Sequence, residues 1–231
     1  MATVRAPQAR ALPWYQWVRP GALYFVGMIP AASTFYLGVT DQLGADPMKT
    51  LERTLGLWAL RFLIVGLAIT PLRQLAGVNL LRYRRAIGLL AFFYAVLHLT
   101  TYLVLDQGLD WHAIWMDIVK RPFITVGMTT FLILLVLAVT SNRFSKSKLG
   151  RKWGKLHRLV YVAAIGGTLH FWQLVKADTT EPWRWAAGFA LLFAIRVWWG
   201  YRPRLAARAI PNSQRPIPNH SQLPTSKSPQ R

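Results

Sequence analysis

Two histidines of this chain lie inside apolar segments, and a third stands at the start of one of these segments. His98 lies within segment 86–105, and His157 and His170 lie thirteen residues apart in segment 157–175. A neutral imidazole nitrogen can bind haem iron, and an ionisable residue in the apolar interior of a membrane is costly and by default functional. Redox chemistry at membrane-bound haem is therefore the first hypothesis that these residues raise.

Helical geometry places the two histidines of segment 157–175 at different depths. At about 1.5 Å rise per residue, His157 and His170 are about 20 Å apart along the axis, compared with a hydrocarbon core of about 30 Å. Their side chains are also about 140° apart around the helix, so they face different neighbours unless the helix is tilted or distorted. Gly166 and Gly167 lie between them and would allow a distortion or the close approach of a haem.

The apolar segments have the length of membrane spans. Of the 231 residues, 53% are hydrophobic and 16% are charged, whereas a typical soluble domain carries about 25% charged residues. The apolar residues gather in blocks of about 20, which cross a bilayer as a helix. The sequence predicts an all-α membrane protein, a six-transmembrane helical bundle with spans 21–40, 55–71, 86–105, 123–140, 157–175 and 185–199. The first span also resembles a signal peptide, with Ala31-Ala32-Ser33 as its cleavage site, although apolar residues continue beyond Ser33.

Charged residues are distributed unequally between the two sets of loops. If the loops are numbered alternately from the N-terminus, all eight Asp and Glu residues fall on the second side. Of the 28 Lys and Arg residues, 20 fall on the first side and six on the second, while Arg61 and Arg196 lie within spans. Because basic loops stay in the cytoplasm, both termini are predicted to be cytoplasmic. This pattern explains the net charge of +20 better than binding of nucleic acid does.

The ends of the chain differ in composition from the spans. Residues 1–19 are expected to form a cytoplasmic N-terminal segment, and residues 203–231, rich in Pro, Ser and Arg, a disordered basic cytoplasmic tail. Residues 20–202 then form one haem-binding domain surrounded by membrane lipid. Between the third and fourth spans, the sequence WHAIWMDIV is interpreted as a short helix at the membrane surface, a depth that Trp favours.

With the predicted topology, His98 and His170 reach the same depth. Both spans run outward from the cytoplasm, and the two histidines lie about twelve and about thirteen residues into them. A haem held edge-on between two helices needs one imidazole from each helix at equal height, which this pair provides in the outer half of the membrane. The alternative interpretation is that the two histidines are hydrogen-bonded packing residues.

His157 stands at the cytoplasmic end of its span, level with Arg84 and Arg85 rather than with another histidine. Arginine is a poor iron ligand because it stays protonated. An inner haem would be held by His157 with water or another residue, or there is no inner haem and the arginines bind a haem propionate or a flavin phosphate. The chain has no cysteine, which excludes iron–sulfur clusters and covalently attached haem, and no G-x-G-x-x-G or P-loop motif.

Two segments that carry the histidines, RRAIGLLAFFYAVLHLTTYL and GKLHRLVYVAAIGGTLHFWQLVKAD, resemble a known family. It is the MsrQ family, formerly YedZ: the haem-binding membrane subunits of the bacterial periplasmic methionine-sulfoxide reductase system. The family belongs to the ferric-reductase-like transmembrane group, alongside NADPH oxidases and metalloreductases. The resemblance covers roughly residues 15–202.

The resemblance implies a multi-pass protein of the bacterial inner membrane that carries one or two b-type haems and FMN. Such a subunit passes electrons from the quinone pool, or from a cytosolic flavin reductase, to MsrP. This periplasmic molybdenum enzyme reduces methionine sulfoxide in oxidised proteins, so catalysis at the sulfoxide resides in the partner. By matching positions, His98, His157 and His170 are the family's haem-associated histidines, and Arg84 stands where larger relatives place a fourth histidine.

The sequence shows no dehydrogenase domain that would take electrons from NAD(P)H, so we expect a relay subunit. Two alternatives remain open. The first is a self-sufficient transmembrane ferric or oxygen reductase that acts at the outer haem. The second is a non-redox membrane protein in which the histidines are structural.

Overall fold

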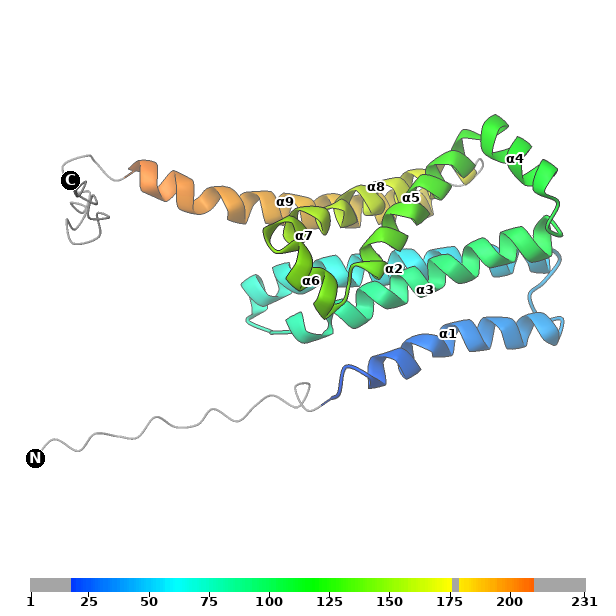
Figure 1. Cartoon of the computed structure of the whole chain (residues 1–231), viewed down its shortest axis with the longest axis horizontal. Coiled ribbons are helices and arrows are strands. Elements are labelled where there is room, and N and C mark those ends of the chain that lie inside the picture. The colour runs from blue at the N-terminus through cyan, green and yellow to red at the C-terminus, as the bar shows by residue number, and fades with distance from the viewer. Residues whose placement is uncertain (1–17, 176–178, 210–231) are drawn as a thin grey trace, which may run out of the picture. The chain divides into compact units, whose positions relative to one another are not determined.

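The computed structural model describes residues 18–175 and 179–209, and within these ranges every regular element is a helix (Figure 1). Contacts divide the chain into two units, Met1–Leu192 and Phe193–Arg231. The helices are α1 (Ala22–Val39), α2 (Pro47–Ala76), η2 (Leu81–Tyr83), α3 (Arg84–Thr100), the π-helical η3 (Thr101–Asp106), α4 (Trp111–Lys120), α5 (Pro122–Val139), α6 (Arg143–Leu149), α7 (Arg151–Leu156), α8 (Leu159–Leu174) and α9 (Thr180–Ala209). All lie in the first unit except α9, which begins there and continues into the second.

Four of the described helical segments are long and apolar enough to cross a membrane: α1, α2, the segment Leu81–Asp106 that contains α3, and α5. The predicted fifth and sixth spans are also helical. However, α8 has only 16 residues, and α9 carries Glu181 and several arginines. The structure therefore confirms a helical membrane protein and leaves the count of six spans as a prediction. Residues 1–17 and 210–231, which contain most of both predicted terminal segments, lie outside the described residues.

The caps of α2 make it longer than the predicted span 55–71. The Asp46 carboxylate accepts a hydrogen bond from the Lys49 backbone N–H at 3.2 Å, and Pro47 occupies the first turn, where its missing N–H is not needed. The Lys49 side chain donates to the same carboxylate at 2.7 Å and holds the pKa of Asp46 below its ordinary value. At the other end, Gly77 adopts the left-handed conformation that ends a helix.

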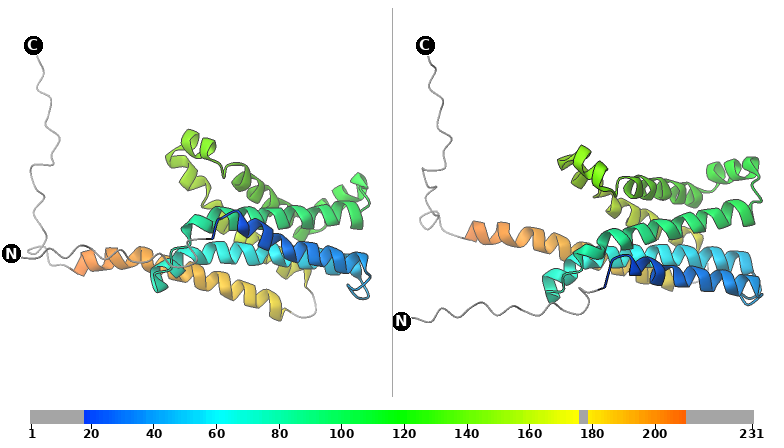
Figure 2. Two further views of the ribbon diagram at one scale, coloured as in Figure 1. Left: turned by 90° about the horizontal axis from the view of Figure 1, so that it is seen from below. Right: turned by 60° about the horizontal axis from the view of Figure 1, so that its bottom comes forward.

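Helices α1, α2 and α3 run side by side (Figure 2), and the Tyr94 side chain lies completely buried between them. Its hydroxyl donates to the Gly27 carbonyl at 2.7 Å and accepts from the Ala31 backbone N–H at 2.9 Å. These two backbone groups of α1 stand in an i, i+4 relation beside Pro30. Tyr94 of α3 therefore bridges the backbone of α1 at its internal proline.

Two helix pairs build the rest of the first unit. Helix α2 packs along α3, and α5 packs along α8; contacts between α3 and α5 and between α2 and α8 join the two pairs. At Gly166 and Gly167, α8 continues without a break. A Cβ atom on Gly166 would collide with the Thr130 hydroxyl of α5, and one on Gly167 would lie 3.1 Å from Leu60 of α2. The two glycines thus allow close helix packing, rather than a distortion of α8.

Candidate functional site

The structure brings His98 of α3 and His170 of α8 together. Their ring centres are 6.1 Å apart, with the ring planes at 75°. Two imidazoles on opposite sides of one metal ion have ring centres about 6 Å apart, if each metal–nitrogen bond is about 2 Å and each nitrogen lies about 1 Å from its ring centre. The spacing of this pair is therefore compatible with two imidazoles that would hold one haem iron between them.

Backbone carbonyls from the other two helices fix the protonation of both rings. Nδ1–H of His98 donates to the Glu52 carbonyl of α2 at 2.9 Å, and Nδ1–H of His170 donates to the Phe123 carbonyl of α5 at 2.6 Å. Because a carbonyl can only accept, the proton of each neutral ring is on Nδ1 and the lone pair is on Nε2. A metal-binding histidine usually has its second nitrogen held in this way.

Two glycines make room for these imidazoles, each four residues after the carbonyl that its histidine contacts. A Cβ atom on Gly127 of α5 would lie 2.8 Å from Cε1 and Nδ1 of His170. A Cβ atom on Gly56 of α2 would lie 3.3 Å from Nδ1 of His98. The sequence analysis did not identify either glycine. The signal that could have found them is a glycine within an otherwise apolar helix, which often marks close packing.

His157 lies apart from this pair, in the connection between α7 and α8. Its hydrogen bond is made by Nε2, whereas His98 and His170 use Nδ1. Its ring stacks on Trp153 with the centres 4.0 Å apart, and its Nε2 lies 3.1 Å from the Thr140 hydroxyl oxygen. That hydroxyl donates to the Val136 carbonyl at 2.7 Å, so its oxygen accepts from Nε2–H of His157. In this arrangement Nδ1, not Nε2, carries the lone pair of His157.

A cavity of about 550 Å³ lies beside His157, among α2, α3, α5, α6, α7 and α8. This volume is within the range of about 300–1,000 Å³ that is typical of cofactor sites. Its lining combines apolar side chains such as Phe62 and Leu134 with the aromatic residues Trp153 and Tyr161. The lining contains no carboxylate, and its cations are Arg84, Arg85, Arg143, Lys146 and Arg158. We call this space the inner cavity; it would favour an anionic ligand with an aromatic part.

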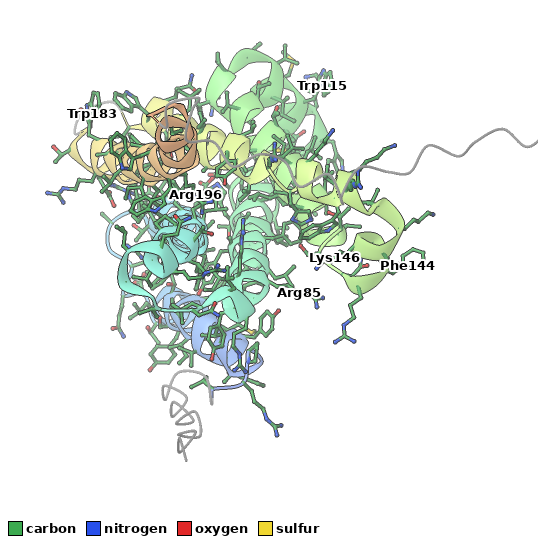
Figure 3. The ribbon with its side chains drawn as sticks, turned by 90° about the vertical axis from the view of Figure 1, so that its left-hand side faces the viewer. Arg85, Trp115, Phe144, Lys146, Trp183 and Arg196 are labelled. Carbon is green, nitrogen blue, oxygen red and sulfur yellow. The ribbon has the colours of Figure 1, made fainter. Side chains whose placement is uncertain are left out.

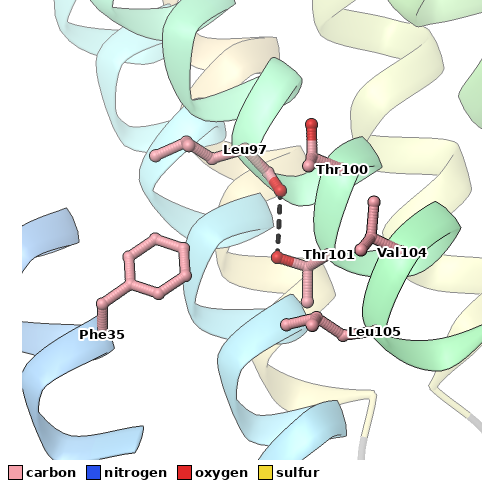
Figure 4. Close-up of a pocket in the computed structure, with 6 residues that line it drawn as sticks. All are labelled: Phe35, Leu97, Thr100, Thr101, Val104 and Leu105. Atoms are coloured by element: carbon pink, nitrogen blue, oxygen red, sulfur yellow. Dashed lines mark hydrogen bonds between the residues drawn. The ribbon is translucent and has the colours of Figure 1, made fainter. Parts of the chain in front are cut away.

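A smaller apolar recess of about 220 Å³ lies beside the helix of His98 (Figure 4). Phe35 of α1 faces the junction of α3 and η3 there, where Leu97, Thr100, Thr101, Val104 and Leu105 complete the lining. The Thr101 hydroxyl donates to the Leu97 carbonyl at 3.0 Å. A π-helix directly after α3 widens the backbone at this point, as such turns often do near functional sites.

Arg84 and Arg61 lie in different parts of the structure. Arg84 lines the inner cavity with His157, as their predicted common depth requires. Arg61 lies with its guanidinium 4.5 Å from the ring centre of Trp58. Within the described residues, no group of three or more His, Asp or Glu side chains is placed to hold a metal ion.

Known proteins resemble this chain over most of its length. A family described as "Ferric reductase like transmembrane component" matches residues 55–168, which include His98 and His157. Proteins from Brucella ovis, Brucella canis and Brucella suis, each described as "Protein-methionine-sulfoxide reductase heme-binding subunit MsrQ", are 55% identical to the chain over 195 residues. The match covers 84% of this chain and 86% of each relative, and no solved structure matches. The chain therefore belongs to the MsrQ family.

Proposed function

We propose that this protein is the membrane electron-transfer subunit of a methionine-sulfoxide reductase system and that its partner is the periplasmic molybdenum enzyme MsrP. The relatives are named as heme-binding subunits of such a reductase. The observation that carries the proposal is the pair His98 and His170, whose ring centres are 6.1 Å apart. In this arrangement the partner reduces the sulfoxide and this subunit supplies the electrons.

His98 and His170 would hold one b-type haem through their Nε2 atoms. Bound haem supplies one-electron redox chemistry. The Glu52 and Phe123 carbonyls keep each Nε2 unprotonated, and Gly56 and Gly127 let each ring lie against the backbone of the neighbouring helix. Four helices thus fix the two ligands, which limits the rearrangement that accompanies a change in the iron's charge.

The inner cavity would hold FMN, rather than a second haem. His157 is the one histidine in its lining, and its Nε2–H is engaged by Thr140. The cations Arg84, Arg85 and Arg158 suit the phosphate of FMN, and the aromatic residues of the cavity suit its ring system. His157 and Arg84 would then act as flavin-binding residues.

The proposed topology has six spans in the bacterial inner membrane, with both termini in the cytoplasm. Residues 20–202 form the ferric-reductase-like domain, preceded by the segment 1–19 and followed by the tail 203–231. The charge distribution supports this orientation, because all eight acidic residues belong to loops on one side. It places the inner cavity at the cytoplasmic end and the His98–His170 pair in the outer half, nearer to MsrP.

Two electron donors are compatible with this arrangement. A cytosolic flavin reductase would deliver electrons to the inner cavity. Quinol would instead use the recess beside Thr100, where Phe35 offers a ring and the threonine an exposed hydroxyl. Replacing Phe35 with Ala should slow reduction by a quinol analogue and leave reduction by the flavin reductase unchanged, if quinol uses this recess.

A reduced-minus-oxidised absorption spectrum of the purified protein, with haem and flavin counted per chain, tests the proposal. We expect a b-type spectrum with one haem and one FMN per chain. Two haems per chain would place the second beside His157 and contradict an FMN site there. A colourless protein from haem-replete cells would favour the non-redox alternative. Rapid reduction of ferric chelates without a partner would favour a self-sufficient reductase.

A further inference from the structure

None of the side chains of the short helix α6 is buried. Phe144 is 74% exposed, although exposure of a large apolar side chain to water is unfavourable. Lys148 lies on the same face of the helix, with its ammonium 5.8 Å from the centre of the Phe144 ring. This face, Phe144 with Ser147 and Lys148, is called the α6 face below. It has no covering element in the described part of the chain.

The segment around α6 is strongly and uniformly basic. Residues 141–158 contain no Asp or Glu. Their cations are Arg143, Lys146, Lys148, Arg151, Lys152, Lys155 and Arg158, all of them exposed. An exposed aromatic ring among cations, without acidic residues, is the pattern of segments that bind the surface of an anionic membrane.

The position of α6 matches the level of a membrane surface. Thr140 caps α5, which has the length of a span, and Asn142 caps α6, so one residue separates the two caps. Figure 2 shows α6 and α7 projecting sideways from the bundle rather than along its axis. In the view along the bundle, Phe144 lies at the periphery of the molecule (Figure 3). Lipid surrounds a membrane protein on this lateral side, whereas a soluble partner would approach along the axis.

We propose that the α6 face is a docking site for anionic phospholipid. Phe144 inserts its ring below the headgroups, and Lys148 binds a lipid phosphate. The opposite side of α6 faces the inner cavity. Lys146 lines this cavity, and its ammonium lies 5.6 Å from the Trp153 ring centre. Lipid bound on one side of the helix thus holds in place a residue that lines the cavity on the other side.

Absence of native cysteine allows a direct test with the full-length protein. Ser147→Cys carries a polarity-sensitive fluorophore on the α6 face, while Phe144 and Lys148 are kept. The protein is placed in nanodiscs of phosphatidylcholine alone or of equal parts phosphatidylcholine and phosphatidylglycerol. Quenching by lipids that are spin-labelled near the headgroup is compared with quenching by aqueous iodide. Circular dichroism and thermal unfolding of every variant confirm that it is folded.

In the mixed nanodiscs we expect blue-shifted emission, quenching by the labelled lipid and protection from iodide. Phosphatidylcholine alone should give a several-fold weaker effect. Lys148→Gln should lower the affinity for phosphatidylglycerol about fivefold, as the loss of one cation near a charged surface does. Lys120→Gln, an exposed cation on α4, should leave it unchanged. Phe144→Ser should abolish quenching by lipid.

Two results would overturn the proposal. A fluorophore that iodide quenches equally in both compositions, without quenching by lipid, would leave the α6 face to a soluble partner. Equal quenching by lipid in both compositions would exclude a role for the anionic headgroup.

Discussion

At the scale of single residues, His98 and His170 differ from His157 in which ring nitrogen is engaged. The sequence predicts that His98 and His170 lie at equal depth, since rise per residue and positions within spans are sufficient for that prediction. It does not show the partners of their Nδ1 atoms, because a backbone carbonyl has no side-chain signature. The same is true of Thr140, whose hydroxyl engages His157 only because α5 ends beside α7.

Replacing His98 or His170 should remove the proposed haem. His98→Ala and His170→Ala each delete one of the two proposed ligands. This is a larger change than loss of the group that hydrogen-bonds to a ligand, which costs about 10- to 100-fold in metal affinity. Haem per chain should fall below about one-tenth of the normal value, and MsrP-dependent repair of methionine sulfoxide should stop. His112→Ala, in the exposed part of α4, is the control. Normal haem content in either variant would refute the two-histidine site.

Gly127→Ala should disturb the proposed haem site without removing a ligand. The new Cβ atom would lie 2.8 Å from the His170 ring, so the ring or α5 must move. We expect reduced haem occupancy and an altered spectrum, measured by absorption and electron paramagnetic resonance. Gly21→Ala adds the same methyl group where nothing lies within 4 Å and should change neither. An unaltered spectrum for Gly127→Ala would show that its lack of a side chain is not needed for the site.

At the scale of elements, the sequence predicts the apolar spans well and their ends poorly. Hydrophobicity determines where a helix can cross a membrane, but caps determine where it stops. The Asp46–Pro47 cap extends α2 well beyond the apolar run. The basic loop after the fourth span is two short helices, because Asn142 accepts a hydrogen bond from the Ser145 N–H and starts α6. These local contacts leave no trace in the hydropathy pattern.

Tyr94→Phe should destabilise the packing of α1 on α3. Removing the hydroxyl leaves the Gly27 carbonyl and the Ala31 N–H without their present partner, and an unpaired buried backbone group costs about 1–3 kcal/mol. We expect an unfolding free energy lower by about that amount in detergent. Tyr36→Phe, at an exposed residue of the same helix α1, should be neutral. Equal stability of the two variants would mean that α1 closes its own hydrogen bonds once the hydroxyl is gone.

At the scale of the whole molecule, the two helix pairs hold their histidines in the same way. In α2 and α3, the Glu52 carbonyl and Gly56 receive His98; in α5 and α8, the Phe123 carbonyl and Gly127 receive His170. Each carbonyl precedes its histidine by nearly the same distance along the chain, 46 and 47 residues. The two proposed haem ligands are therefore held by two similar, pseudo-symmetric helix pairs. The sequence alone did not reveal this repeat, since it rests on backbone atoms and single glycines.

The number of spans depends on whether α8 crosses the membrane. Its 16 residues measure about 24 Å, shorter than a hydrocarbon core of about 30 Å, so it spans only if flanking residues or a thinned bilayer make up the difference. With six spans, the single cysteines Thr3→Cys, Ser147→Cys and Ser221→Cys should react with an impermeant maleimide only after the cells are permeabilised. Ala45→Cys, in the loop between α1 and α2, should react in intact spheroplasts. Reaction of Ser221→Cys from outside, with Thr3→Cys protected, would mean an odd number of spans and would remove either α8 or α9 from the bilayer.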